Sequence, residues 1–302
     1  MAILLNIILP VFLIVGTAAL AQTRLHLDIR TLSRTALYLF SPALVFDSLA
    51  SSNVSGTEFG QITAVLILTT LTLWVLGALV ARLLHLGGKT QAAFLIAILI
   101  MNAGNYGLPV NLFAFGEAGL ARASLYFVGS ALLAASLGVY LSARGGATAR
   151  LALRRMVSMP LLHATILGLI FNLGDFTVPE TLAKAIRLLG QAAVPSMLLV
   201  LGVRLAETFQ NWQRAVHLPA LGAVTVLRLV VAPALAWLFA GLVGLNGLGR
   251  DVSVLETAMP TAVMTTILAT EFDSDAPFAA LCVMMTTLVS LPTVTVLLNL
   301  LP

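Results

Sequence analysis

The chain has 302 residues, of which 60% are hydrophobic and 9% are charged, and its mean hydropathy is +1.04. A soluble globular domain usually carries about 25% charged residues, so this composition excludes a soluble enzyme, a nucleic-acid-binding domain and a secreted disulfide scaffold. The formal charge of +4 is explained by basic residues in loops at a membrane surface. The single cysteine, Cys282, lies in an apolar run and cannot form an intramolecular disulfide. The composition therefore predicts a membrane protein.

Apolar stretches recur along the chain, and a helix needs about 20 such residues to cross about 30 Å of hydrocarbon. Breaking the stretches at charged, Gly and Pro clusters predicts ten transmembrane helices, at residues 3–22, 31–50, 60–84, 90–115, 120–142, 158–174, 181–205, 218–244, 252–270 and 276–300. The first stretch ends at Ala19-Leu20-Ala21, which resembles a signal-peptidase site, but no basic residue precedes it. We interpret it as an uncleaved first span of an all-α polytopic membrane protein.

The basic residues are divided unequally between the two sides that these ten spans define. Eleven Lys and Arg residues fall on one side, whereas the other side has only Arg122, Lys184, Arg187 and Arg250. The positive-inside rule makes the first side cytoplasmic. We therefore expect a multi-pass protein of the plasma membrane, the bacterial inner membrane, with both termini outside.

The chain also divides into two halves, residues 1–142 and 158–302, joined by a basic cytoplasmic linker at 143–157. Each half has five spans, an odd number, so the two halves must be inverted relative to each other. Weak internal similarity supports a repeat: a shift of 156 positions superposes Gly104 and Glu117 on Pro260 and Asp273. Chance matching between two apolar strings is the alternative. Inverted repeats are typical of secondary transporters, whose substrate sites lie near the middle of the membrane.

The segment Ile100–Asn111 is unusual for the middle of a span, because it contains two glycines, a proline and three asparagines. Pro109 removes a backbone donor, and Gly104 and Gly107 weaken the helix further. A broken helix at this depth is tolerated only beside protein or a water-filled cavity. We expect such a break, with the three asparagines as donors in a central site; the alternative is a kinked helix whose asparagines bond neighbouring helices. These asparagines are Asn102, Asn105 and Asn111.

The corresponding segment of the second half, Glu256–Thr266, contains Pro260. Its polar residues are threonines, namely Thr257, Thr261, Thr265 and Thr266, and the last three are expected to line the facing half of the site. Two broken helices would direct two N-termini into one site, each with about half a positive charge. Such a site favours an anionic group.

Ionisable residues inside spans are costly and are therefore candidates for function. Arg228 lies near the middle of the span 218–244 and could bind a substrate carboxylate, Glu256 or a backbone carbonyl at a helix break. Glu256 lies one helical turn before Pro260 and is a candidate for proton coupling. His163 could relay a proton or could pack between helices.

Two groups of motifs resemble a known family. Asn102–Pro109 followed by Phe115–Gly119 resembles the fourth-span signature of the auxin efflux carrier family, and Ala258–Val263, Ile267–Asp275 and Thr286–Ser290 resemble its ninth and tenth spans. The match covers the whole chain in the number and order of spans. The resemblance implies two inverted five-helix repeats and a division into a scaffold and a transport domain. It also implies that the fourth and ninth spans cross at prolines, that the protein moves as an elevator and that it forms homodimers.

Prokaryotic members of that family are commonly assigned to organic anions such as malonate or malate, and plant members export indole-3-acetate. The long central cytoplasmic loop of many plant members is missing here. The sequence thus predicts a secondary transporter of small carboxylates in the lipid bilayer, coupled to a proton or sodium or to neither, with no cofactor, bound metal or nucleic acid. A channel or carrier for a cation or a neutral solute is the main alternative. An intramembrane enzyme is disfavoured because the predicted spans of this chain lack Gly-x-Ser-x-Gly and His-Glu-x-x-His motifs.

Overall fold

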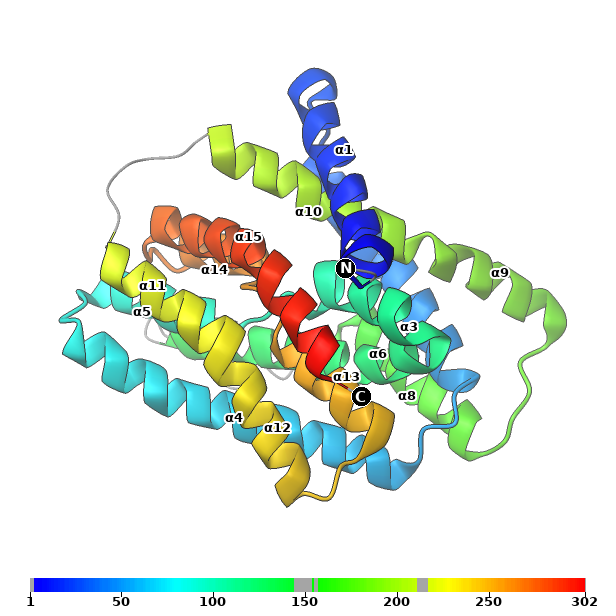
Figure 1. The fold of residues 1–302 in the computed structure, drawn as a ribbon. Coiled ribbons are helices and arrows are strands. Elements are labelled where there is room, and N and C mark those ends of the chain that lie inside the picture. Colours follow the sequence, from blue (N-terminus) through cyan, green and yellow to red (C-terminus); the bar gives the residue numbers. More distant parts are fainter. Residues whose placement is uncertain (1–2, 144–153, 155–156, 211–216, 302) are drawn as a thin grey trace.

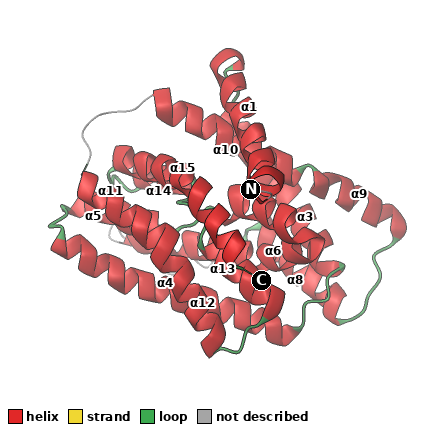
Figure 2. Ribbon diagram, viewed as in Figure 1, coloured by secondary structure: helices red, strands yellow, loops and turns green. Residues whose placement is uncertain are grey.

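The computed structural model describes residues 3–143, 154, 157–210 and 217–301. Throughout these ranges the secondary structure is helical, without a strand, as Figure 2 shows. The expected linker at 143–157 falls almost entirely outside the described residues. The prediction of an all-α protein is confirmed.

The helices follow one another with short connections, and four of them are single π-helical turns, labelled η. Those before the central linker are η1 (Leu4–Ile8), α1 (Leu9–Leu25), α2 (Ile29–Thr35), η2 (Ala36–Phe40), α3 (Ser41–Ala50), α4 (Gly56–Leu83), α5 (Gly88–Leu99), η3 (Ala103–Gly107) and α6 (Leu108–Ala143). Those after it are α8 (Pro160–Leu173), α9 (Glu180–Gln191), α10 (Ala193–Gln210), α11 (Leu218–Val226), η4 (Leu227–Val231), α12 (Ala232–Leu242), α13 (Gly247–Thr257), α14 (Met264–Glu271) and α15 (Ala276–Leu300).

Six helical stretches among the described residues are long and apolar enough to cross a membrane. They are Leu5–Leu25, Gly56–Leu83, Ala103–Ser136, Glu180–Phe209, Leu218–Leu242 and Ala276–Leu300, and α5 and α8 are shorter apolar helices. Helix α4 shows the pattern: Leu66, Leu73 and Ala81 are buried, whereas Leu71 and Val75 on another face are exposed. A helix that is apolar on its outer face as well is stable in lipid. The chain is therefore a polytopic membrane protein.

Polar side chains mark where several helices begin. The Asp28 carboxylate accepts hydrogen bonds from the Thr31 hydroxyl at 2.5 Å and from the Arg30 N–H at 3.0 Å, and these bonds lower the pKa of this carboxyl. The Ser55 hydroxyl accepts from the N–H of Glu58 at the start of α4. Such caps satisfy N–H groups that have no partner within the first turn of a helix.

Helix α6 contains a change of direction at Gly116, where φ is +63° and ψ is −159°. A positive φ is readily adopted only by glycine. The kink lies between the expected spans 90–115 and 120–142, so glycine allows the chain to turn there without a longer loop.

The helices pack as two groups that meet along a central boundary. In the first helix group α1 packs against α10, and α3 packs against α8 and α9. In the second helix group α12 packs against α4 and α13, α5 packs against α4 and α15, and α6 packs against α13. Figure 1 shows α1 crossing α10, and α11–α12 running beside α15. The boundary between these two groups contains the site described next.

Candidate functional site

Two helices of the second group are broken, and the breaks cross each other. Helix α5 ends at Leu99 before η3 begins at Ala103, and α13 ends at Thr257 before α14 begins at Met264. The intervening segments pair in antiparallel fashion: the Asn102 N–H donates to the Pro260 carbonyl at 2.8 Å, and the Ala262 N–H donates to the Ile100 carbonyl at 2.9 Å. Each break thus satisfies backbone groups of the other, as membrane depth requires.

The position of the first break corrects one expectation. The chain leaves the helix at Ile100–Asn102, ahead of Pro109, and the crossing point is Met101 opposite Thr261. Pro109 is the second residue of α6, which follows η3 directly, so it lies inside the helical stretch Ala103–Ser136 and beyond the crossing point. Of the two prolines expected at the crossing, only Pro260 lies there.

Arg228 joins the C-terminal ends of both interrupted helices. Its side chain is fully buried; Nη1 donates to the Ile98 carbonyl at 2.7 Å, and Nη2 donates to the Thr257 carbonyl. These carbonyls belong to the last turns of α5 and α13, where helices carry partial negative charge and lack backbone donors. Of the three partners considered from the sequence, the structure thus shows the backbone carbonyl at a helix break.

Thr261 fixes the crossing to its neighbours. Its hydroxyl donates to the Ala97 carbonyl of α5 at 2.8 Å, and its N–H donates to the Thr286 hydroxyl of α15 at 3.0 Å. Thr265 is buried and Thr266 is half-buried at the start of α14, and neither lines the cavity described below. Thr261 therefore holds the crossover together.

A second buried contact connects α6 with α13. One Glu256 carboxyl oxygen, Oε1, accepts from the Asn111 amide at 2.9 Å, and the same amide donates to the Gly107 carbonyl at 3.0 Å. Nearby, the Tyr126 and Thr257 hydroxyls share a hydrogen bond of 2.6 Å. Glu256 and Asn111 are both fully buried, so this contact is part of the packing between the two helices.

Gly107→Ala is expected to destabilise this contact. A Cβ atom at this position would lie 2.4 Å from Glu256 Oε2 and 2.6 Å from Oε1, closer than atoms can approach. Overpacking of this kind costs about 1–3 kcal/mol, so the apparent unfolding temperature in detergent should fall. Gly222→Ala in α11 is the control, because nothing lies within 4 Å of its added Cβ. Equal unfolding temperatures for the two variants would contradict close packing at Gly107.

A cavity of about 250 Å³ lies between the two helix groups, beside the crossover. Its polar lining consists of Ser33, Ser41, Asn102, Asn105, Ser130 and Arg204. The remaining lining is apolar and includes Leu37, Phe127, Met197, Met264 and Ile267. Residues of α2, η2, α3 and α10 form one wall, and residues of the two broken helices and α6 form the other.

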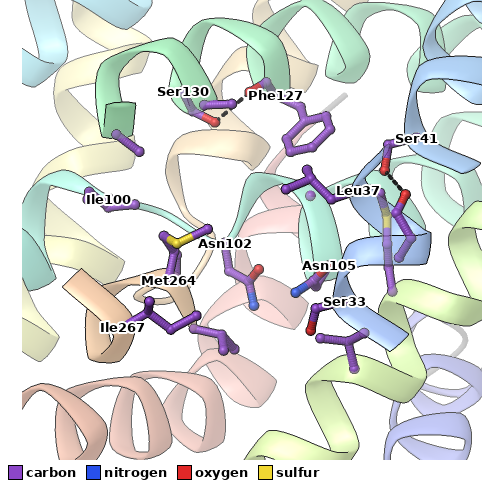
Figure 3. Close-up of a pocket in the computed structure, with 18 of the residues that line it drawn as sticks. Ser33, Leu37, Ser41, Ile100, Asn102, Asn105, Phe127, Ser130, Met264 and Ile267 are labelled. Atoms are coloured by element: carbon purple, nitrogen blue, oxygen red, sulfur yellow. Dashed lines mark hydrogen bonds between the residues drawn. The ribbon is translucent and has the colours of Figure 1, made fainter. Parts of the chain in front are cut away.

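Asn102 and Asn105 project from the start of η3 into this cavity, and Figure 3 shows their amide groups pointing toward the space between them. The Asn102 side chain is buried, and its Nδ2 atom has no hydrogen-bond partner. Gly104 lines the same wall. The cavity therefore presents amide donors beside the N-terminal end of a helix.

The start of α14 lies on the same cavity, since Ala262, Val263 and Met264 line it. The N-terminal ends of η3 and α14 both carry backbone N–H groups and partial positive charge. The structure thus brings two helix starts to one cavity.

Several expected site residues lie elsewhere. Asn111, Glu256 and Arg228 are in the buried contacts between helices, and none of them lines the cavity. His163 lies in a separate groove between α3, α8 and α9, where its Nδ1 is 3.0 Å from the Met159 carbonyl.

Sequence reasoning missed the part of the cavity that comes from the first helix group. Ser33 and Leu37 lie in the second expected span, and Arg204 lies in the seventh. Arg204 is one of the eleven basic residues that the sequence assigns to the cytoplasmic side. The one available signal was the central proline of each of these spans, Pro42 and Pro195, which marks a possible kink but does not indicate which side chains face a cavity.

Comparison with known proteins gives consistent matches over nearly the whole chain. Residues 3–298 match the family described as "Membrane transport protein". An "Uncharacterized transporter" of Methanothermobacter thermautotrophicus is 34% identical, over 87% of this chain and 86% of that protein. Another from Methanocaldococcus jannaschii is 28% identical, over 87% and 86%. A "Putative malonate transporter" of Rhizobium meliloti is 30% identical, over 87% of this chain and 84% of that protein.

Proposed function

The chain belongs to the membrane transport protein family, the auxin efflux carrier family that its motifs resemble, and on that premise we propose that it is a secondary transporter of small organic anions. The family and the names of its relatives identify a transporter and not an enzyme. The observation that carries the anion proposal is the cavity where the starts of η3 and α14 meet the Asn102 and Asn105 amides. The substrates that we propose are carboxylates, such as malonate, malate or auxin-like acids.

We propose that transport follows an elevator mechanism. The first helix group would serve as the scaffold, and the second would carry the bound anion across the membrane. Two observations support this assignment. The cavity lies between the groups, so sliding one along the other would change the side to which it opens. The contacts of Arg228, Thr261 and Glu256 all connect elements of the second group, so the crossover can move as one unit.

We further propose ten spans arranged as two inverted five-helix repeats, residues 1–142 and 158–302. The two helix breaks support this arrangement because each falls in the fourth expected span of its half. The inner membrane as location, both termini outside and a homodimer complete the proposal. The position of the termini follows from the distribution of basic residues.

The coupling ion, if there is one, is proposed to be a proton or sodium. Glu256 is the proposed proton carrier because it is a fully buried carboxyl one turn before the crossing segment. His163 is less suitable on position, since it lies in the groove between α3, α8 and α9.

Carboxylates are expected to stabilise the detergent-purified protein against heat. A ligand that binds only the folded state at a hundredfold excess over its Kd adds about 2.7 kcal/mol. The measurement is a thermal shift with monocarboxylates, dicarboxylates, amino acids and indole acids, at two pH values and with or without sodium. Saturable stabilisation by one class of carboxylate would support the anion proposal and identify the class. A dependence of that stabilisation on pH or on sodium would identify the coupling ion.

A response to a cation or a neutral solute alone would contradict the anion proposal. It would favour the alternative of a channel or carrier for such a solute on the same fold. Flux that saturates with substrate concentration distinguishes a carrier from a channel.

A further inference from the structure

We propose that Arg204 of α10 binds the carboxylate of the transported anion. This inference rests on the proposed function and adds the residue that recognises the charge. Arg204 is the one charged side chain among the described residues that line the cavity. Its side chain is 25% exposed, in contrast to the fully buried Arg228.

The hydrogen bonds of Arg204 leave donors for a ligand. Its Nη1 donates to Glu207 Oε2 at 3.1 Å, within the same helix. Its Nε is buried and has no hydrogen-bond partner. A guanidinium has five N–H donors in a planar fork that fits a carboxylate in a bidentate manner. Arg204 can therefore bind a carboxylate without first losing a structural contact between helices.

Arg228 differs from Arg204 in its position and in its Nη contacts. Its Nε is likewise buried without a partner, but both of its Nη atoms donate to backbone carbonyls of the crossover, and it does not line the cavity. Arg228, which the sequence suggests as an anion ligand, thus has backbone carbonyls as its partners. Arg204, in contrast, lies where an anion could reach it.

Arg204 and the asparagines come from different helix groups. Arg204 is in α10 of the first group, whereas Asn102 directly precedes η3 and Asn105 lies in η3, which leads into α6 of the second group. Asn102 contributes a second buried donor without a partner to the same cavity. An anion bound between them would contact both groups, so its charge would be recognised by one group and its position fixed by the other.

Glu207 gives the inference a second consequence. Its carboxylate forms an ion pair with Nη1 of Arg204. A substrate carboxylate would compete with Glu207 for this N–H donor. Removing the Glu207 charge should therefore strengthen carboxylate binding, whereas removing the Arg204 charge should weaken it. Opposite effects of two neighbouring substitutions are not expected from a general loss of stability.

The test measures Kd by thermal shift and calorimetry with malonate, propionate and indole-3-acetate, each compared with its uncharged amide, on the full-length protein in detergent. Arg204→Gln is expected to raise the Kd of a binding carboxylate by about tenfold or more, because a bidentate ion pair is lost. The same substitution should leave the Kd of any amide that binds unchanged, and Arg204→Lys should give an intermediate Kd. Glu207→Gln should lower the carboxylate Kd severalfold.

Arg82→Gln is the control. Arg82 is exposed at the end of α4, so this substitution removes the same charge at a position away from the cavity. If Arg204→Gln and Arg82→Gln have equal effects on carboxylate binding, the inference is wrong while the proposed function stands. If Arg204→Gln does not fold, weaker or unchanged carboxylate binding by Glu207→Gln contradicts the inference. If the unmodified protein binds no carboxylate in this panel, the proposed function and the inference both fail.

Discussion

Asn105→Leu is expected to reduce carboxylate transport to background while the protein stays folded and inserted. Asn105 lines the cavity at the start of η3, and it is partly exposed there. Leucine has a similar size but no hydrogen-bond donor, so it removes an interaction with the anion that is worth about 1.5–3 kcal/mol. Loss of about one to two powers of ten in affinity follows from that value alone. The leucine side chain also cannot replace the water that the substrate carboxylate loses on binding, and this lowers transport further.

Transport should be measured in proteoliposomes at a substrate concentration below the KM, with the amount of inserted protein quantified. Asn299→Leu is the matched control, because Asn299 is exposed near the end of α15 and its amide donates to the Thr295 carbonyl at 2.7 Å. Unchanged uptake kinetics in Asn105→Leu would remove Asn105 from the site. Loss of inserted protein in this variant alone would show that Asn105 is needed for folding.

Arg228→Met is expected to lower the stability of the protein by about 3 kcal/mol. The substitution leaves the Ile98 and Thr257 carbonyls buried without a donor, and each unsatisfied group costs about 1–3 kcal/mol. Part of this cost is offset because a cation is no longer buried. Arg228→Lys should be intermediate, since an ammonium group cannot reproduce the planar fork that reaches two carbonyls.

The measurement for Arg228 is the apparent unfolding temperature in detergent, together with the Kd for a carboxylate. Lys184→Met is the control, because Lys184 forms an exposed ion pair with Glu180 in α9 and its loss should change the stability by less than about 1 kcal/mol. A stable Arg228→Met protein that no longer binds carboxylates would contradict this prediction. It would show that Arg228 is an anion ligand and that its hydrogen bonds to the two helix ends are not needed for stability.

The helical nature of this protein and its most informative segments could be predicted from the sequence, because their signals are local. Long apolar runs can be stable only as helices in lipid. Glycine, proline and asparagine interrupt such a run at Ile100–Asn111, and Pro260 interrupts the corresponding run of the second half. The composition also excludes soluble classes of protein without any knowledge of contacts.

The location of the first helix break was less predictable. The sequence predicts a break within Ile100–Asn111, with Gly104, Gly107 and Pro109 as its markers, whereas the helix is interrupted at Ile100–Asn102, where the backbone pairs with Pro260 and Ala262. Pro109 lies inside the helical stretch that begins at Ala103, so this proline does not mark the break itself. The break is stable because a second interrupted helix supplies the missing partners, and that partner is more than a hundred residues away along the chain.

The direction in which each polar side chain points was decided by the tertiary structure. A transmembrane helix is apolar on nearly every face, so its periodicity does not reveal which face meets lipid, a neighbouring helix or a cavity. Asn102 and Asn105 face the cavity, whereas Asn111, farther along in α6, bonds to Glu256. Arg228 was identified from its position in a span, but only its contacts with two helix ends show what holds its charge.

A helical membrane protein with interrupted spans could thus be predicted from the sequence, because the free energy of placing a segment in hydrocarbon depends on its composition and on local backbone chemistry. The set of residues that share the cavity could not be predicted, because the cavity walls come from distant parts of the chain. Arg204 and Asn105 lie on opposite walls and are separated by the central linker in sequence. Their proximity results from the packing of two helix groups, which no spacing within either segment encodes.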